Sequence, residues 1–404
     1  MRDRMSPGSG RGPGPRRRAA ALAVALFVYG FGEELWSRFI PEYLRSLGAS
    51  ALVLGAYGTL RDLLDAAYAY PGGAISDRLG SGRALLLFGA MTTLGIACYL
   101  TWSSIPAIFA GLFLVMAWRS LGLPASFALI AEELRGGGRL VGFTVQAVVK
   151  RIPIVLAPPL GGLLISRLGM RAGLRVGFAV SLVLCLAMLA GLWRAFRSRE
   201  ERRALTHATA STPIRLRPAL RQLLVADCLI RLCEGLPDVF LVVWAMEVVR
   251  VSPAQFGILV AVLTATSILS DLPAAAFAER VERKPFVVLT YVFFTLFPVA
   301  VLCSTSFPEL VGAYVLGGLR EIGEPARKSL IVDLADETAR GRTVGVYYAI
   351  RGFAVAGAAA IGGVLWSLRP AFTFLAATAL GALGTAWAVL FLPSSQRDMV
   401  IEGH

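Results

Sequence analysis

The chain has 404 residues, of which 56% are hydrophobic and only 16% are charged. Soluble domains carry roughly 25% charged residues, and a soluble protein of this size needs more charge to cover its surface. Together with a mean hydropathy of +0.67, these values exclude a soluble enzyme, a nucleic-acid-binding domain and a disordered chain. The net charge of +14 comes mostly from short loops between apolar runs, which is typical of membrane topology. We expect an all-α membrane protein that crosses the bilayer many times.

Twelve apolar runs are long enough to cross a bilayer, because a spanning helix needs about 20 residues. They occupy residues 19–42, 51–76, 84–103, 105–131, 140–165, 175–194, 221–245, 254–278, 286–304, 308–332, 343–366 and 371–392. The one long connector, 195–220, is polar and arginine-rich. We therefore predict two six-helix bundles, 19–194 and 221–392, joined by a linker at 195–220. A basic tail, 1–18, precedes them and a second tail, 393–404, follows.

Basic residues predict how the chain is oriented. Segments on the side of the N-terminus hold about four times as many Lys and Arg residues as the loops on the opposite side,. Because such residues collect in cytoplasmic loops, both termini and the linker are predicted to be cytoplasmic. The expected location is the inner (plasma) membrane of the cell.

The two halves repeat each other in sequence. Residues 202 positions apart match as Gly55 and Gly257, Pro71 and Pro273, Asp77 and Glu279, and Arg78 and Arg280, and residues 201 apart match as Arg119 and Arg320, and Lys150 and Arg351. Because each half has six spans, an even number, both halves begin on the same side of the membrane and share one orientation. An axis along the membrane normal therefore relates them. This symmetry predicts a solute site where the two halves meet.

Charged residues within the apolar runs show which helices face a polar interior. Each charge costs roughly 3 kcal/mol at the centre of a lipid-facing helix. The third, sixth, ninth and twelfth runs contain no charge between their ends, so we expect these four to contact lipid and the other eight to line a lumen. The charges nearest mid-span are predicted to form the proton-coupling and substrate cavity: Glu33, Glu34, Arg119, Glu234, Arg320, Glu321 and Glu324. Further interior charges are predicted at the bundle interface: Lys150, Arg351, Arg61 and Asp65.

Helical spacing predicts partners for several of these charges, because residues four apart face each other on a helix. The pairs are Glu34 with Arg38, Arg61 with Asp65, Arg320 with Glu324, and Glu324 with Lys328. A ladder of Asp227, Arg231, Glu234 and Asp238 follows one face of the seventh run. The simpler interpretation is that such pairs only neutralise one another and hold helices together.

The loop after the second run carries the most specific motif, Gly73-Ala74-Ile75-Ser76-Asp77-Arg78-Leu79-Gly80-Ser81-Gly82-Arg83. With the twelve spans, the central loop and the repeat, it resembles the major facilitator superfamily. A weaker copy, which begins Glu279-Arg280, follows the eighth run. The resemblance implies a cytoplasmic gate in which the Asp77 carboxylate caps the eleventh span. The residues assigned to this gate are Gly73, Asp77, Arg78, Gly80, Arg83, Glu279 and Arg280.

Two further segments are similar to motifs of the same family. Arg119 resembles a fourth-span arginine associated with proton coupling, although the glycine at 122 comes one position early. The segment Ala157-Pro158-Pro159-Leu160-Gly161-Gly162 resembles the antiporter motif of the fifth span, with Pro153 and Ala157 in place of two of its glycines. The resemblance implies alternating access and favours export.

The leading hypothesis is a secondary transporter that exports a small organic or drug-like solute in exchange for protons. No G-x-x-x-x-G-K-[ST] motif for ATP is present,, so the energy must come from an ion gradient or from the solute's own gradient. Carboxylates can exchange protons at membrane depth, and we rank Glu33 and Glu34 first and Glu234 next. The five cysteines lie in apolar runs and the two histidines lie outside them. We therefore expect no metal, no cofactor, no enzymatic activity and no nucleic-acid partner, but a monomer in a lipid bilayer.

Two alternatives stay open. One is proton-coupled uptake of an organic anion, with Arg119, Arg320 and Arg351 as an anion clamp. The other is a membrane sensor or assembly partner that moves no solute and uses the 195–220 segment to bind its partner.

Overall fold

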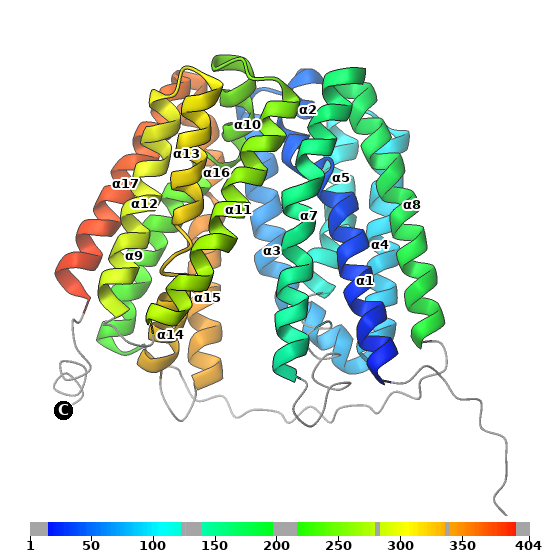
Figure 1. Cartoon of the computed structure of the whole chain (residues 1–404), viewed down its shortest axis with the longest axis horizontal. Helices are drawn as coiled ribbons and strands as arrows, with labels where there is room; N and C mark the ends of the chain where they lie inside the picture. Colours follow the sequence, from blue (N-terminus) through cyan, green and yellow to red (C-terminus); the bar gives the residue numbers. More distant parts are fainter. Residues whose placement is uncertain are drawn as a thin grey trace, which may run out of the picture.

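The computed structural model describes residues 15–122, 126, 139–196, 216–278, 283–335 and 340–392. The described elements are all helical (Figure 1). Most of the predicted linker and tails, together with Glu279 and Arg280, lie outside these residues. As far as the described residues go, each of the twelve apolar runs lies in one helix or in helices separated by a turn, which confirms the all-α fold.

The first half runs from α1 to α8. Its elements are α1 (Pro15–Glu34), η1 (Ser37–Phe39), α2 (Ile40–Ser46), α3 (Ala51–Leu79), α4 (Ser81–Thr101), α5 (Ile105–Met116), η2 (Ala117–Leu121), α7 (Arg139–Leu168) and α8 (Met170–Phe196). The second half runs from α9 to α17. Its elements are α9 (Pro218–Gly235), η3 (Asp238–Phe240), α10 (Leu241–Val243), η4 (Trp244–Val248), α11 (Pro253–Ala278), α12 (Arg283–Cys303), α13 (Phe307–Leu319), α14 (Glu324–Leu334), α15 (Arg340–Ala356), α16 (Ala358–Leu368) and α17 (Pro370–Phe391).

Several spans that the hydropathy pattern shows as continuous runs are interrupted near their middle. The first breaks after Glu34, the seventh after Gly235 and the tenth after Leu319. Pro237 cannot donate a helical hydrogen bond, which explains the second of these breaks. The breaks in the first and seventh spans fall at equivalent positions of the repeat, so interruption is a shared feature of the two halves. Broken helices leave backbone polar groups free, which membranes tolerate beside protein or a cavity.

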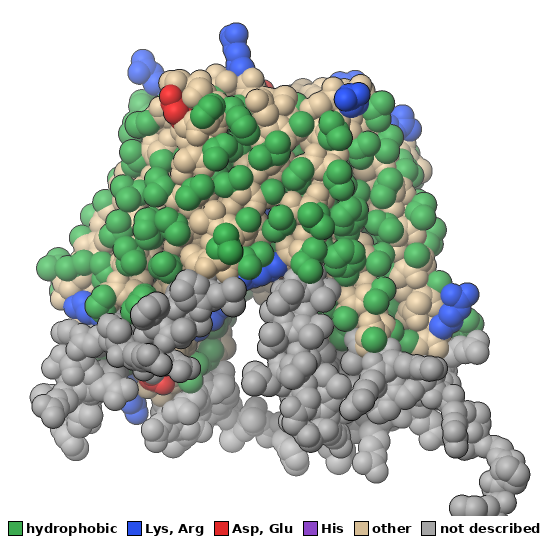
Figure 2. Space-filling view, viewed as in Figure 1, with side chains coloured by type: hydrophobic (Ala, Val, Ile, Leu, Met, Phe, Trp, Pro, Cys, Tyr) green, Lys and Arg blue, Asp and Glu red, His purple; other side chains and the backbone are tan. Residues whose placement is uncertain are grey.

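The outer surface is apolar, as a membrane protein requires. Among the described residues, eight helices are long and apolar enough to cross a membrane. The α8 and α17 helices, predicted to meet lipid, carry exposed apolar side chains that include Val183, Leu186, Leu383 and Leu390. Apolar side chains spread over the described face of the molecule, and the charges in that view lie mostly towards its two ends (Figure 2).

The two halves pack against each other at the end that is uppermost in Figure 1. There α7 contacts α11 and α3 contacts α16. The backbone N–H of Ala254 donates to Ser166 Oγ at 3.1 Å, and that of Ala360 donates to Thr59 Oγ1 at 3.0 Å. We name this the closed end. We name the opposite end the open end, because the halves border a cavity of ≈ 680 Å³ there, lined by Asp65 of α3 and Arg351 of α15.

Glycines allow the close approach of helices at the closed end. A Cβ added at Gly162 would lie 2.7 Å from the carbonyl carbon of Pro253, and one added at Gly257 would lie 2.6 Å from that of Pro158. We expect Gly162→Ala to separate α7 from α11 and to shift the protein towards a conformation that opens this end, because overpacking costs about 1–3 kcal/mol.

Spin labels on Ser46→Cys and Val248→Cys test this expectation in a chain whose five native cysteines are replaced by serine. The distance between the labels should lengthen in Gly162→Ala. The control is Gly191→Ala, where an added Cβ contacts nothing within 4 Å. The same distance distribution in both variants would show that this packing does not hold the end closed.

Candidate functional site

The first half contains a cavity of ≈ 330 Å³ at the point where its first span breaks. Glu33 and Glu34 are the last two residues of α1 and lie on the wall of this cavity, with Arg119 opposite them on η2. A helix C-terminus carries a partial negative charge and attracts cations, so two carboxylates there need basic partners. The break thus places a cluster of charges at the middle of the span.

Basic side chains of two different spans neutralise these carboxylates. Arg38 Nε donates to Glu34 Oε2 at 3.1 Å, which confirms the predicted pair. Arg119 Nη1 lies 3.5 Å from Glu33 Oε1. The η2 segment is a π-helix, a form that is frequent at functional sites. About half of the Arg119 side chain, 51%, remains exposed, so its guanidinium is accessible from the cavity.

Arg61 and Asp65 do not form the predicted pair. Arg61 Nη2 lies 2.9 Å from Asp62 Oδ1 and 2.6 Å from Asp238 Oδ2, which belongs to the second half. Asp65 instead accepts a hydrogen bond of 2.5 Å from Ser120 Oγ. Helical spacing failed here because a carboxylate from the other half competes for Arg61. Arg61 therefore links the two halves through the middle of the molecule.

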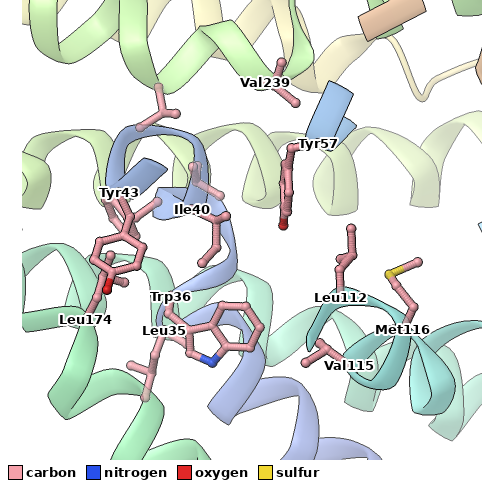
Figure 3. Packing of buried hydrophobic residues seen from close by; sticks show 14 of the residues in the cluster. Leu35, Trp36, Ile40, Tyr43, Tyr57, Leu112, Val115, Met116, Leu174 and Val239 are labelled. Carbon is pink, nitrogen blue, oxygen red and sulfur yellow. The ribbon is translucent and has the colours of Figure 1, made fainter. Parts of the chain in front are cut away.

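A smaller cavity of ≈ 200 Å³ lies beside the Arg61–Asp238 pair, and Glu33, Arg38, Asp65 and Arg119 line both it and the larger cavity. Apolar side chains form part of its wall. Figure 3 shows Trp36, Tyr57, Leu112, Val115 and Met116 converging there. The Trp36 indole is held in place because Nε1 donates to Ser181 Oγ at 2.9 Å.

Lys150, on α7, also lines the larger cavity. In the described part of the chain, no carboxylate oxygen lies within ion-pair distance of its Nζ. Lys150 therefore differs from Arg119 and Arg38, whose charges are neutralised by Glu33 and Glu34.

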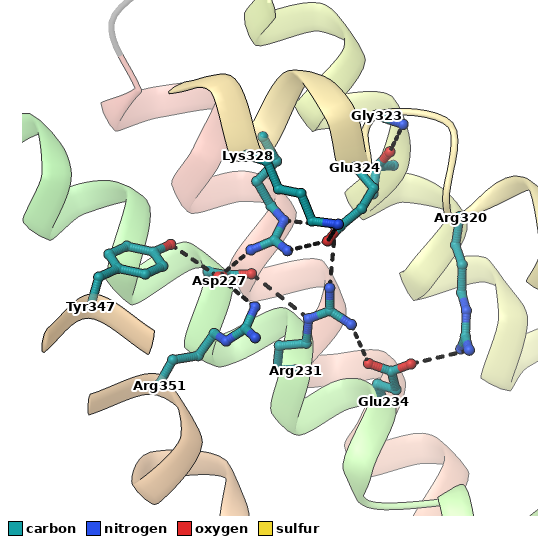
Figure 4. A network of polar contacts seen from close by, with 11 residues as sticks. Asp227, Arg231, Glu234, Arg320, Gly323, Glu324, Lys328, Tyr347 and Arg351 are labelled. Carbon is teal, nitrogen blue, oxygen red and sulfur yellow. Dashed lines mark hydrogen bonds and ion pairs between the residues drawn. The ribbon is translucent and has the colours of Figure 1, made fainter. Parts of the chain in front are cut away.

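The second half contains a dense network of ion pairs centred on Asp227 (Figure 4). Asp227 Oδ2 lies 2.6 Å from Arg327 Nη1 and 3.3 Å from Arg351 Nη1, and it accepts a hydrogen bond of 3.0 Å from the Tyr347 hydroxyl. The Asp227 and Arg327 side chains are only 1% and 2% exposed. These contacts tie α9, α14 and α15 together, so the network acts as a brace for the second half.

Arg231 and Glu324 extend this network towards the break in the tenth span. Arg231 lies 2.7 Å from Glu234 and 3.3 Å from Glu324. Lys328 lies 3.4 Å from Glu324, as predicted. Arg320, which sequence spacing pairs with Glu324, instead lies 3.1 Å from Glu234. The turn between α13 and α14 explains this difference, because it interrupts the helical spacing.

The predicted ladder on the seventh span is confirmed only in part. Asp227, Arg231 and Glu234 interact along α9, at 3.9 Å for the first pair and 2.7 Å for the second. Asp238 lies beyond the helix break and pairs with Arg61 instead. The three proposed clamp arginines, Arg119, Arg320 and Arg351, each lie beside a carboxylate. Glu321 is half-buried in the turn at residues 320–323, where the described residues give it no ion pair.

A third cavity, of ≈ 160 Å³, is lined by residues of both halves, and its aromatic side chains are Tyr57, Phe256, Phe294, Phe297 and Tyr314. The Arg320 guanidinium carbon lies 5.1 Å from the ring centre of Phe294 and 5.5 Å from that of Phe297. Arg38, Tyr57 and Arg61 line both this cavity and the ≈ 200 Å³ cavity. The three cavities are thus neighbours across the interface of the halves, where the repeat predicts a site.

A fourth cavity, of ≈ 680 Å³, lies between the halves and adjoins the brace. Asp62 and Asp65 of α3 line it on one side, and Arg351 of α15 and Arg231 of α9 line it on the other. Charged side chains of both halves therefore border one space, as the lumen hypothesis expects.

Only some of the residues assigned to the predicted gate belong to the part of the chain that the structure describes. Gly73 lies within α3, Arg78 is exposed in its last turn, and Gly80 ends the helix with a φ of 85°. This left-handed conformation favours glycine. Arg83 lies in the first turns of α4. The Asp77 side chain, with Glu279 and Arg280, lies outside the described residues, so the capping role of Asp77 stays a prediction.

Three solved structures with the same architecture are those of membrane transporters. A POT family transporter in complex with a thioalcohol-conjugated peptide matches with a TM-score of 0.74 at 13% identity, over 93% of this chain and 95% of that one. A bacterial homologue of the human lysosomal transporter Spinster, in an inward-facing conformation, matches with a TM-score of 0.70 at 15% identity, over 97% and 96%. The human organic anion transporter MFSD10 (TETRAN) matches with a TM-score of 0.63 at 18% identity, over 93% and 100%.

The TM-scores of these three matches show a shared fold and, at such low identities, the fold alone. A comparison with curated protein sequences found no match. The family model of the Major Facilitator Superfamily matches residues 22–233 and again 223–402, which together cover nearly the whole chain. This match confirms a multi-pass membrane protein that moves a small molecule and is not an enzyme. The chain belongs to the major facilitator superfamily of secondary transporters.

Proposed function

We propose that this protein couples the transport of a small organic solute with an anionic group to protons, and that Glu33 carries the proton. The observation that carries the proposal is the Glu33–Arg119 pair on the wall of the ≈ 330 Å³ cavity. Glu33 is 11% exposed whereas Arg119 is 51% exposed. The arginine can therefore reach a solute while the carboxylate lies behind it.

Protonation of Glu33 would change the charge of this site. An ionised Glu33 neutralises Arg119, whereas a protonated Glu33 leaves the guanidinium without its partner. An anionic group could then bind Arg119, since Arg binds carboxylates through several donors. A proton and an anionic solute would thus favour each other's binding, as linkage requires. Both would be carried together in one cycle.

This reasoning favours the uptake hypothesis over the export hypothesis. The segment 157–162, which resembles an antiporter motif, packs helices in this structure: a Cβ on Gly161 would clash with the Leu35 backbone, and one on Gly162 with Pro253. Packing accounts for both glycines without a role in antiport. An organic anion transporter and peptide transporters are among the solved structures with this fold, and solutes of these kinds suit the basic side chains of the cavity.

Alternating access requires each end to open in turn. The positive-inside prediction assigns the open end to the cytoplasm, so the structure would be the inward-open state. At the closed end, Arg45 lies 3.0 Å from Glu247 across the two halves. The Arg61–Asp238 pair would also have to separate when this end opens. The loop with Asp77 is proposed to close the cytoplasmic end in the other state.

Proteoliposomes with an imposed pH gradient test the proposed function. A panel of radiolabelled organic anions, zwitterions and cations should be offered with the outside acidic and then with the inside acidic. We expect solutes with an anionic group to accumulate when the outside is acidic. Exchange of organic cations for protons would instead support export. No flux of any solute, together with a partner bound through residues 195–220, would support the sensor alternative.

A further inference from the structure

The charges that line the ≈ 330 Å³ cavity are not equally available to a solute. Glu33 and Glu34 each lie within 3.5 Å of an arginine, Arg119 and Arg38 respectively. These two pairs are neutral as they stand. The remaining charged residues of the wall are one cation, Lys150, and one carboxylate, Asp65.

Lys150 has no carboxylate partner among the described residues, although it is half-buried within an apolar, membrane-length helix. An ammonium group in such a place is stabilised by an opposite charge. An anionic group in the cavity could accept hydrogen bonds from Lys150.

Asp65 presents the opposite charge. Its carboxylate accepts a hydrogen bond from Ser120 Oγ at 2.5 Å, and the described residues give it no ion pair. The Asp65 residue is exposed and lines three of the cavities. A cation that enters the lumen can therefore reach this carboxylate, and a hydroxyl donor leaves most of its acceptor capacity unused.

We infer that this cavity binds a zwitterionic solute, with its anionic group at Lys150 and its cationic group at Asp65. Leu26, Trp118 and Ile154 line the same space and would contact an apolar body between the two groups. The inference deepens the proposed function, on which it rests: a proton on Glu33 would add Arg119 to the anion site. It differs from the arginine clamp because its primary cation is a lysine of α7.

Three probes that share one apolar body test the inference. They are L-phenylalanine, a zwitterion, 3-phenylpropionate, which lacks the ammonium group, and 2-phenylethylamine, which lacks the carboxylate. Binding to the purified full chain in detergent is measured by calorimetry at neutral pH. Because each hydrogen bond to a charged group is worth about 1.5–3 kcal/mol, L-phenylalanine should bind at least about tenfold more tightly than either of the others.

Two variants assign the charges to their residues. Lys150→Gln should weaken the binding of L-phenylalanine and of 3-phenylpropionate by about tenfold or more, and it should leave the affinity for 2-phenylethylamine unchanged. Asp65→Asn should weaken the binding of L-phenylalanine and of 2-phenylethylamine by about tenfold or more, and it should leave the affinity for 3-phenylpropionate unchanged. The probe that each variant should still bind shows that the variant is folded.

The inference is overturned if the three probes bind equally or not at all, or if either variant weakens all three alike. The assay needs neither transport nor a gradient, so its outcome is separate from that of the proteoliposome experiment. If the protein prefers L-phenylalanine over the two singly charged probes but shows no proton-driven flux, the proposed function is rejected and the binding site is kept. If it shows proton-driven flux of simple anions but no such preference, the binding site is rejected and the proposed function is kept.

Discussion

Glu33→Gln is expected to abolish proton-driven accumulation while leaving solute exchange intact. Glutamine keeps the shape of a protonated Glu33, so Arg119, 3.5 Å away in the native pair, is permanently free to bind an anionic group. The variant can still move solute in either direction, but it cannot carry the proton. Glu33→Gln, which replaces one carboxylate oxygen by an amide nitrogen, is thus expected to remove proton coupling and to leave translocation of the solute intact.

The size of the pH gradient sets how much solute the native protein is expected to accumulate. One pH unit is worth about 1.4 kcal/mol per proton, which supports about tenfold accumulation. In proteoliposomes, this accumulation should fall to near the equilibrium level in Glu33→Gln, while counterflow persists. Glu309→Gln, in the exposed first turn of α13, is the control and should accumulate solute normally. If Glu33→Gln and Glu34→Gln both keep full accumulation, the proton site does not lie on α1.

Asp227→Ala should destabilise the second half more than any change at an exposed ion pair. The substitution leaves Arg327, which is 2% exposed, and Arg351 without the carboxylate that now lies 2.6 Å and 3.3 Å away. Removing one partner of a buried ion pair costs about 3–5 kcal/mol. Thermal unfolding of the purified protein should show a clearly lower midpoint than that of the native chain.

Glu247→Gln is the matched control for this stability measurement. It breaks the Arg45 pair, whose side chains are 33% and 37% exposed, and such pairs are worth about 0–1 kcal/mol. The double variant Asp227→Leu/Arg327→Met should recover part of the loss, since apolar residues of similar volume can replace a buried pair. Equal midpoints for Asp227→Ala and Glu247→Gln would show that the network is not a brace.

Hydropathy and the order of charges predict much of the fold. Apolar length alone locates the twelve spans, because the bilayer sets the length of a spanning helix. The lack of mid-span charge predicts the apolar outer faces of α8 and α17. Glu34 and Arg38 pair as spacing predicts, even though a turn separates them.

Partners from distant parts of the chain could not be predicted. Helical spacing only relates residues three or four apart, whereas Glu33 meets Arg119 and Arg61 meets Asp238 across 86 and 177 positions. Tyr347, which completes the contacts of Asp227, carries no signal in a single sequence. The breaks at residues 35–36 and 320–323 also escape hydropathy, because they interrupt runs that stay apolar.

The most direct test is the proton balance of solute binding. L-phenylalanine, or another solute with an anionic group found in the panel, is added to the purified protein in weakly buffered solution near neutral pH, with a soluble pH indicator. We predict that the protein takes up protons, approaching about one per bound solute, and that Glu33→Gln takes up none while still binding. Proton release on binding, or uptake that persists in Glu33→Gln, would contradict the account.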